Sequence, residues 1–243
     1  MAINALLFDL GGTLLTRDIE DRLVDEEALK SLAEYLASKG CTVSEEDLLW
    51  RYWAHYRMIN DLRERFLIEI PMRVWLGSLI SKLCNLHMVD EALNTVEAKI
   101  VDARVESAIL FPDTVNVLEV LRDSYRLGVV TNTSSEKVTK KILRRLDLNR
   151  YFECIVTSAE LGVRKPYPGI FLYALREMRL RADETVFIGD SFKHDIIGSR
   201  QANMRNCLVC HEETEASDGL PAPDLTAKSL SELLRTLETT HHL

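Results

Sequence analysis

The sequence predicts an α/β protein with a doubly wound parallel sheet and an all-helical segment inserted after the first strand. Two observations predict this fold. Short apolar runs alternate with amphipathic stretches outside the region 17–107, and that region keeps helical periodicity without a convincing strand. Strands that alternate with helices favour a parallel sheet, because each crossover helix carries the chain back to the same edge.

The strands are predicted from short, almost continuous apolar runs, which are typical of strands buried on both faces. The first run, 3–8, ends at Asp9, and the pair Gly11 and Gly12 follows closely. The later runs are 127–130, 154–156, 186–188 and 207–209. Amphipathic helices are expected at 115–125, 136–146, 169–178 and 194–202. The strands and helices together predict a Rossmann-like core.

The insert is predicted to contain helix after helix. Its first helix is expected to stop at Gly40. Ser44 followed three residues later by Asp47 is a capping pattern that predicts the start of the second helix. Further helices are expected at 71–84 and 89–105.

The composition excludes several classes of protein. The chain has 243 residues, of which 47% are hydrophobic and 28% charged, and its formal net charge is −8. The negative charge argues against nucleic acid as a partner, because duplex binding depends on Lys and Arg that neutralise phosphates. No stretch approaches the roughly 18 consecutive apolar residues of a membrane span, and the N-terminus has no basic leader. We therefore expect a soluble, cytoplasmic protein that acts on a small molecule, with no membrane partner.

The five cysteines are scattered along the chain, unlike the dense cysteines of a disulfide-stapled secreted domain, so free thiols are expected. Cys207 and Cys210 form a CxxC pair, but there is no second pair, and the two stand at the ends of the apolar run CLVC. We interpret them as strand residues rather than metal ligands or a redox pair.

Polar residues stand where the apolar runs stop, which is where open α/β sheets bind ligands. They are Asp9, Gly11, Gly12 and Thr13 after the first run, Thr131 and Asn132 after the second, Lys165 in the loop after the third, and Asp190, Ser191 and Asp195 after the fourth. Each residue alone has a simpler interpretation as a helix cap, a turn residue or a solvated lysine. Together they supply a carboxylate nucleophile, a hydroxyl, an amide, a cation and carboxylates for a hard metal ion, which is what phosphoryl transfer requires.

Four segments resemble the four motifs of the haloacid dehalogenase superfamily, and they occur in the same order: FDLGGTLL, GVVTNTS, GVRKPYPGIF and FIGDSFKHDIIGSRQANM. The helical insert lies where many members carry a cap domain. The resemblance therefore implies a catalytic core of residues 1–16 and 108–243 and a cap of residues 17–107. It is specific for the fold and not for the substrate.

The resemblance also implies a Mg²⁺-dependent hydrolase of a small phosphorylated molecule. Asp9 would attack phosphorus and form an aspartyl-phosphate, which water then hydrolyses. The metal ion would be held by Asp9, the carbonyl of Gly11 and Asp190, with Asp195 as a nearby or second-shell partner.

The remaining motif residues are implied to bind the phosphoryl group. Thr131 would donate its hydroxyl to a phosphoryl oxygen, and Asn132 would line the same pocket. Lys165 would hold both the nucleophile and the transferred group by charge. The backbone around Gly11 and Gly12 could approach the phosphoryl group closely because no Cβ intervenes.

The chain departs from the resemblance at Gly11. In the phosphatases of the superfamily this position is usually a second Asp, which protonates the leaving group and then activates water. A positioned acid or base contributes about 10² to 10⁴ in rate. The implied metal site is unaffected, since the ligand at this position is a carbonyl oxygen.

Three explanations of Gly11 are open. The substrate has a good leaving group, such as an acyl phosphate, or the acid comes from the cap, with candidates His55, Tyr56 and Glu64. Alternatively, the chain is similar to phosphonate-cleaving relatives, which use a cap lysine. The lysines considered are Lys30, Lys39, Lys82 and Lys99. In the third explanation the chain binds phosphate without turnover, although a binding module would not need all the catalytic roles filled. Dehalogenases are disfavoured because they work without a metal ion.

A smaller departure from the resemblance is Asn203, where relatives often have Gly. We expect Asn203 to adopt the left-handed conformation, which Asn tolerates better than most residues.

Overall fold

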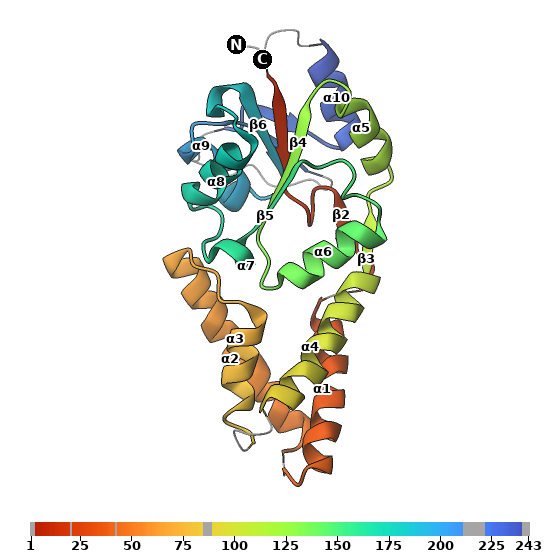
Figure 1. Ribbon diagram of the computed structural model, residues 1–243, viewed down its shortest axis with the longest axis vertical. Helices are drawn as coiled ribbons and strands as arrows, with labels where there is room; N and C mark the ends of the chain where they lie inside the picture. Colours follow the sequence, from red (N-terminus) through yellow and green to blue (C-terminus); the bar gives the residue numbers. More distant parts are fainter. Residues whose placement is uncertain (1–2, 20, 42, 85–88, 211–221, 240–243) are drawn as a thin grey trace.

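The computed structural model is an α/β structure built on a six-stranded parallel sheet (Figure 1). It describes residues 3–19, 21–41, 43–84, 89–210 and 222–239. In spatial order the strands are β5 (Cys154–Thr157), β4 (Arg126–Thr131), β1 (Ala5–Phe8), β6 (Thr185–Gly189), β7 (Arg205–Val209) and β8 (Leu225–Ala227). The chain runs outward from β1 to β4 and β5, then returns to β6 on the other side of β1. The predicted fold class is confirmed, and β1 lies where the strand order reverses.

Helices cover both faces of this sheet. One face carries α5 (Thr114–Leu121), α6 (Glu136–Arg145) and α10 (Leu230–Thr239). The other carries α8 (Pro168–Met178) and the segment after α9 (Ile197–Gln201), while α7 (Ser158–Leu161) follows β5 directly. Because successive side chains of a strand point to opposite faces, Leu6 and Phe8 join the first hydrophobic layer and Leu7 joins the second.

The insert is a set of helices that begins and ends at a small antiparallel ribbon of β2 (Leu15–Arg17) and β3 (Ala108–Leu110). Its helices are α1 (Asp21–Ser38), α2 (Glu45–Phe66), α3 (Met72–Ile80) and α4 (Val89–Glu106). The cap at Ser44 is confirmed, since its side chain accepts a hydrogen bond of 3.1 Å from the Asp47 N–H. Gly40, at φ 84°, follows the end of α1 as predicted.

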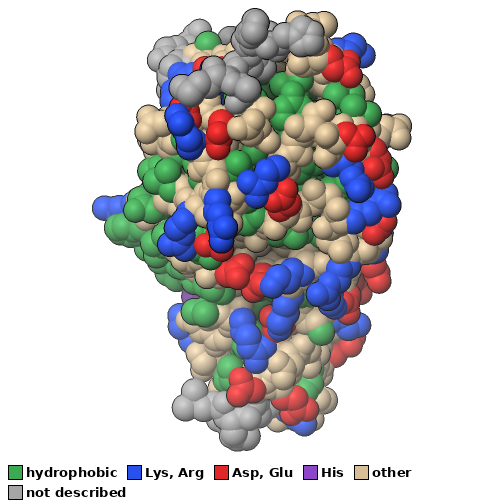
Figure 2. Space-filling model, turned by 45° about the horizontal axis from the view of Figure 1, so that its top comes forward, with side chains coloured by type: hydrophobic (Ala, Val, Ile, Leu, Met, Phe, Trp, Pro, Cys, Tyr) green, Lys and Arg blue, Asp and Glu red, His purple; other side chains and the backbone are tan. Residues whose placement is uncertain are grey.

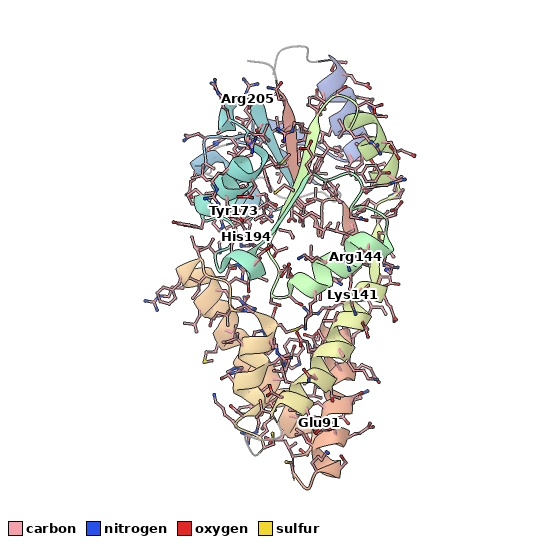
Figure 3. The ribbon with its side chains drawn as sticks, viewed as in Figure 1. Glu91, Lys141, Arg144, Tyr173, His194 and Arg205 are labelled. Carbon is pink, nitrogen blue, oxygen red and sulfur yellow. The ribbon has the colours of Figure 1, made fainter. Side chains whose placement is uncertain are left out.

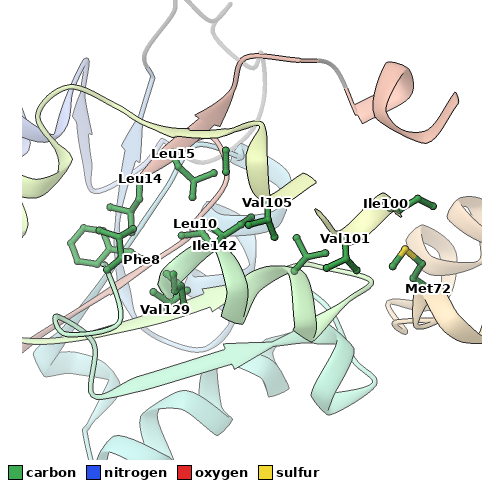
Figure 4. Close-up of a cluster of buried hydrophobic side chains, with 14 of the residues drawn as sticks. Phe8, Leu10, Leu14, Leu15, Met72, Ile100, Val101, Val105, Val129 and Ile142 are labelled. Atoms are coloured by element: carbon green, nitrogen blue, oxygen red, sulfur yellow. The ribbon is translucent and has the colours of Figure 1, made fainter. Parts of the chain in front are cut away.

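The insert packs on the core along α4 and α6. Buried side chains of α4, including Val101 and Val105, belong to the same hydrophobic cluster as Ile142 of α6 and Leu10 beside β1 (Figure 4). Ion pairs flank this contact, with Lys141 Nζ at 2.8 Å from the Asp102 carboxylate. The apolar interior is therefore continuous from the sheet into the insert.

The surface mixes charges of both signs. On the face shown in Figure 2, Lys and Arg side chains are interspersed with Asp and Glu rather than gathered in one basic stripe. Among the described helices, none combines the length and the apolarity needed to cross a bilayer.

Two local predictions are confirmed. Asn203 has a φ of 59°, in the left-handed region. All five cysteines are free thiols. The interpretation of the CxxC pair as strand residues holds for Cys207, which is buried inside β7, but not for Cys210, which directly follows that strand.

Candidate active site

The carboxyl ends of β1, β4 and β6 open into one cavity of about 330 Å³. Its lining residues are Asp9, Gly11, Thr131, Asn132, Lys165, Asp190, Ser191, His194 and Asp195. The register explains this gathering: Phe8 pairs with Val129 on one side and Ile188 on the other, so the residues that follow the three strands emerge at one edge. Of the polar and glycine residues predicted from the sequence, Gly12 and Thr13 are outside this lining. Gly12 borders an adjoining cavity, and the hydroxyl of Thr13 donates to Oδ1 of Asp190 at 3.1 Å.

Lys165 is the centre of the site. Its side chain is 2% exposed, and Nζ lies 2.7 Å from Oδ1 of Asp9 and 2.6 Å from Oδ1 of Asp195. Burial alone would lower the pKa of this ammonium group, but the charges of Asp195 and Asp9 outweigh burial and raise it. Lys165 therefore stays charged and fixes one oxygen of Asp9. In the described part of the chain no hydrogen bond engages the second oxygen of Asp9.

The site holds more negative than positive charge. Asp9, Asp190 and Asp195 each bring one oxygen within 4.8 Å of the others. Burial raises the pKa of Asp190, and the nearby Asp9 raises it further. Burial likewise raises the pKa of Asp195 to about 7, although Lys165 opposes the shift. Both oxygens of Asp195 are already engaged, since the second accepts the N–H of Ser191 at 2.9 Å.

The two glycines after Asp9 differ in whether the structure leaves room for a side chain. Gly12 has a φ of 83°, and a Cβ there would lie 2.3 Å from Oδ2 of Asp190. Only glycine allows this close approach. A Cβ on Gly11 would meet nothing within 4 Å, and its backbone is not in the left-handed region. Space and backbone geometry would therefore admit a side chain at position 11.

The loop after β4 is hydrogen-bonded to the loop that contains Lys165. The side chain of Asn132 donates from Nδ2 to the carbonyl oxygen of Lys165 at 3.0 Å and accepts the N–H of Lys165 at Oδ1, at 2.9 Å. Asn132 thus lines the cavity while its amide fixes the backbone that carries the cation. Thr131 is buried, lines the same cavity and makes no side-chain hydrogen bond within the described residues.

Sequence reasoning did not single out His194, although it stands one residue before Asp195 in the fourth motif. Its Nδ1 lies 3.0 Å from Oγ of Ser191 and its Nε2 lies 3.4 Å from Oε2 of Glu64 on α2. Figure 3 shows His194 where the core meets the insert. Burial lowers the pKa of His194, and Glu64 opposes that shift. Glu64 also pairs with Lys193 and, at 3.3 Å, with Arg164.

Among the insert groups considered as substitutes for the missing acid, Glu64 alone contacts His194. His55 is buried with Nε2 3.1 Å from the carbonyl of Trp75, and Tyr56 packs against the ring of Trp75 at 5.8 Å. None of these three insert residues lines the described cavity. The four insert lysines, Lys30, Lys39, Lys82 and Lys99, are exposed and do not line it either.

A model of the haloacid dehalogenase-like hydrolases matches residues 3–203, which is most of the chain. The protein belongs to this family. It is 30% identical over 241 residues to the glyceraldehyde 3-phosphate phosphatase of Methanocaldococcus jannaschii, with 96% of each chain covered. It is 32% identical over 195 residues to the phosphatase of the same name from Methanothermobacter thermautotrophicus, with 80% of this chain and 73% of the other covered. The predicted family and the prediction of a hydrolase are confirmed.

Solved structures agree on the fold. A 2-haloacid dehalogenase from Pseudomonas syringae is 28% identical with a TM-score of 0.73, and the comparison covers 97% of this chain and 98% of that chain. A HAD phosphatase from Thermococcus onnurineus superimposes with a TM-score of 0.70 at 23% identity, over 97% of this chain and 98% of that chain.

Proposed function

We propose that this hydrolase is a Mg²⁺-dependent phosphatase that cleaves a small phosphate monoester through an aspartyl-phosphate on Asp9. The observation that carries the proposal is the carboxylate of Asp9, with one oxygen held by a buried ammonium group at 2.7 Å and the other unengaged, beside Asp190 at the edge of the cavity. The similarity to two glyceraldehyde 3-phosphate phosphatases supports a phosphate monoester and makes glyceraldehyde 3-phosphate the first substrate to test.

The donor set fits a magnesium ion. Mg²⁺ prefers oxygen ligands and binds through one or two carboxylates while keeping several waters. Asp9, Asp190 and the carbonyl of Gly11 would hold it, and Asp195 would act beside them through Lys165 and Ser191. Three clustered carboxylates and one ammonium group leave a negative excess that a divalent cation would offset. When bound, Mg²⁺ supplies positive charge that offsets the charge of the phosphoryl oxygens.

In the proposed reaction each residue of the site has a separate role. The free oxygen of Asp9 attacks phosphorus, the bond from phosphorus to the ester oxygen breaks, and the leaving oxygen departs with the electron pair and takes a proton from water. Lys165 and the hydroxyl of Thr131 stabilise the charge on the phosphoryl oxygens. Water next attacks the phosphorus of the aspartyl-phosphate, which releases phosphate and regenerates Asp9. Because Gly11 brings no acid, we expect the first step to depend strongly on the leaving group.

The test is phosphate release with and without Mg²⁺ from glyceraldehyde 3-phosphate, p-nitrophenyl phosphate and acetyl phosphate. Asp9→Asn is the control, since it removes the nucleophilic charge with little change of shape. Release that needs both Mg²⁺ and Asp9 supports the proposal. Release that persists in a clean preparation of Asp9→Asn rules out the proposed nucleophile.

Dehalogenation is the second candidate, and two observations favour it. A halide leaves without a proton, so the absence of an acid at Gly11 would not slow that reaction, and the chain is 28% identical to the structure of a 2-haloacid dehalogenase. The cluster of Asp9, Asp190 and Asp195 argues against it, because metal-free chemistry gives no reason to gather these carboxylates. Halide release from a 2-chloro acid in the presence of a chelator distinguishes the two functions.

A further inference from the structure

The segment 67–71, between α2 and α3 of the insert, lies against two active-site loops. Its backbone pairs with the residues just before Lys165: the N–H of Glu69 donates to the carbonyl of Gly162 at 2.9 Å, and the N–H of Arg164 donates to the carbonyl of Leu67 at 3.1 Å. Between these bonds Ile68 and Val163 form an antiparallel bridge. The segment is thus attached to the loop that carries the cation of the site.

Glu69 connects this segment to the second loop. Its side chain is buried, and Oε2 accepts the hydroxyl of Ser158 at 2.8 Å. The same hydroxyl oxygen accepts the N–H of Thr133 at 2.9 Å. Thr133 stands two residues after Thr131, so the chain of bonds from Glu69 ends beside the predicted phosphoryl ligands.

Arginine side chains lie on two sides of the Glu69 carboxylate. Its Oε1 lies 2.8 Å from Nε of Arg63, which also belongs to the insert. On the core side, Arg164 lies 3.9 Å from Oε2 and directly precedes Lys165. Burial raises the pKa of Glu69, and the charge of Arg63 opposes that shift. A buried carboxylate with cations on both sides fixes the position of its neighbours more strongly than an exposed pair does.

We infer that Glu69 is a positioning residue of the active site, through which the insert sets the geometry of the loops that carry Thr131 and Lys165. Glu69 does not line the cavity and does not touch the reacting atoms. It acts through Ser158 and Thr133 on one loop and through Arg164 and the backbone of Gly162 on the other. The inference rests on the proposed function, because it assigns Glu69 a role in that reaction.

The variant Glu69→Gln isolates the charge. Glutamine keeps the size of the side chain and can still accept the hydroxyl of Ser158, but it no longer attracts Arg63 and Arg164. Small displacements of catalytic groups are costly, so kcat is expected to fall about 10- to 100-fold while KM changes by less than about 3-fold. Ser158→Ala removes the hydroxyl that contacts both Glu69 and Thr133 while it leaves the charge of Glu69 in place, and it is expected to act in the same direction.

The matched control is Glu97→Gln. Glu97 is another buried insert carboxylate, paired with Arg73 at 2.7 Å and with Lys137 on α6 at 3.3 Å. It therefore also bridges insert and core, but it contacts neither active-site loop. Glu97→Gln is expected to keep kcat within about 2-fold of wild type, because no catalytic group moves.

The experiment measures kcat and KM of the full-length protein with glyceraldehyde 3-phosphate and Mg²⁺, together with amide hydrogen exchange without substrate. The inference is supported when Glu69→Gln and Ser158→Ala lower kcat and speed exchange at 131–134 and 162–165, while Glu97→Gln does neither. It is overturned when both variants keep kcat within about 2-fold, when exchange in the two loops is unchanged, or when Glu97→Gln loses as much activity. If the wild-type protein releases no phosphate, the proposed function is wrong. The exchange data would then still show whether Glu69 fixes the positions of the two loops.

Discussion

Replacing Gly11 by Asp tests whether the missing acid limits the enzyme. A Cβ at this position meets nothing within 4 Å, and the backbone needs no left-handed conformation, so the variant can fold without a clash. Replacing glycine where the new residue fits stabilises a protein by about 0.4 to 1 kcal/mol through the unfolded state. Repulsion from a neighbouring carboxylate at 4 Å in water costs about 1 kcal/mol. We therefore expect a small net change in the free energy of unfolding.

The expected effect of Gly11→Asp on the reaction is much larger. A positioned general acid contributes about 10² to 10⁴ in rate when the leaving group needs a proton. The neighbouring carboxylates of Asp9 and Asp190 should raise the pKa of the new carboxyl, which favours the protonated form that a general acid requires. The gain should appear with glyceraldehyde 3-phosphate, whose leaving group is a poor alkoxide. It should be nearly absent with acetyl phosphate, whose leaving group departs unaided.

The assay is phosphate release at saturating Mg²⁺ for wild type and Gly11→Asp with both substrates. Gly11→Asn is the matched control, because it has the same shape and cannot donate a carboxyl proton. Gly12→Ala is the steric control: its Cβ would lie 2.3 Å from Asp190, so activity should fall with every substrate. The reasoning is refuted if Gly11→Asp folds, keeps its acetyl phosphatase activity and gains no more than Gly11→Asn on glyceraldehyde 3-phosphate.

Three further predictions concern the nucleophile, the metal ion and the thiols. Asp9→Asn should abolish turnover, measured by phosphate release. The variant should stay folded, as measured by circular dichroism, because it lowers the repulsion among the carboxylates. Unfolding of this variant would contradict that reasoning. Mg²⁺ at about 100 times its Kd should stabilise the wild type by about 2.7 kcal/mol, visible as a higher Tm, and Asp190→Asn should lose most of this shift. An equal shift in Asp190→Asn would place the ion elsewhere. Burial raises the pKa of Cys207 to about 12 and disfavours its thiolate, so Cys207 should stay unreactive toward a disulfide reagent until the protein unfolds. Rapid native labelling of Cys207, located by mass spectrometry, would contradict its burial.

Much of the fold was predictable because the strands beside the site are buried on both faces and therefore form continuous apolar runs. The runs at 127–130 and 186–188 correspond to β4 and β6 within one or two residues. The edge strand β8 was missed, because three residues at the rim of a sheet carry no such pattern. The π-helical turn η3 (Phe192–Ile196) was also missed, since a helical stretch was expected only from residue 194. The conformation of this turn depends on Asp195, because its two carboxylate oxygens accept hydrogen bonds from the Ser191 N–H and from the distant Lys165.

The residues of the site were predictable for the same reason, while the contacts that orient them were not. Asp9 and Asp190 stand immediately after strands and Thr131 ends one, so the order of the chain places them at one edge. The link from Glu69 to Ser158 joins residues 89 positions apart, and neither residue belongs to a motif or a periodic stripe. Such pairs depend on how the insert lies on the core, which no local pattern specifies.

Gly11 changes the charge of the site as well as its proton supply. With an Asp at this position, Lys165 would face a fourth carboxylate near Asp9, Asp190 and Asp195, and the repulsion in the metal-free protein would increase. With Gly11, the protein lowers that repulsion and loses the acid. In the proposed mechanism Lys165 and Thr131 would stabilise the phosphoryl charge, while the departing oxygen would take its proton from water. The intrinsic quality of the leaving group should therefore decide which phosphorylated molecules this hydrolase turns over quickly.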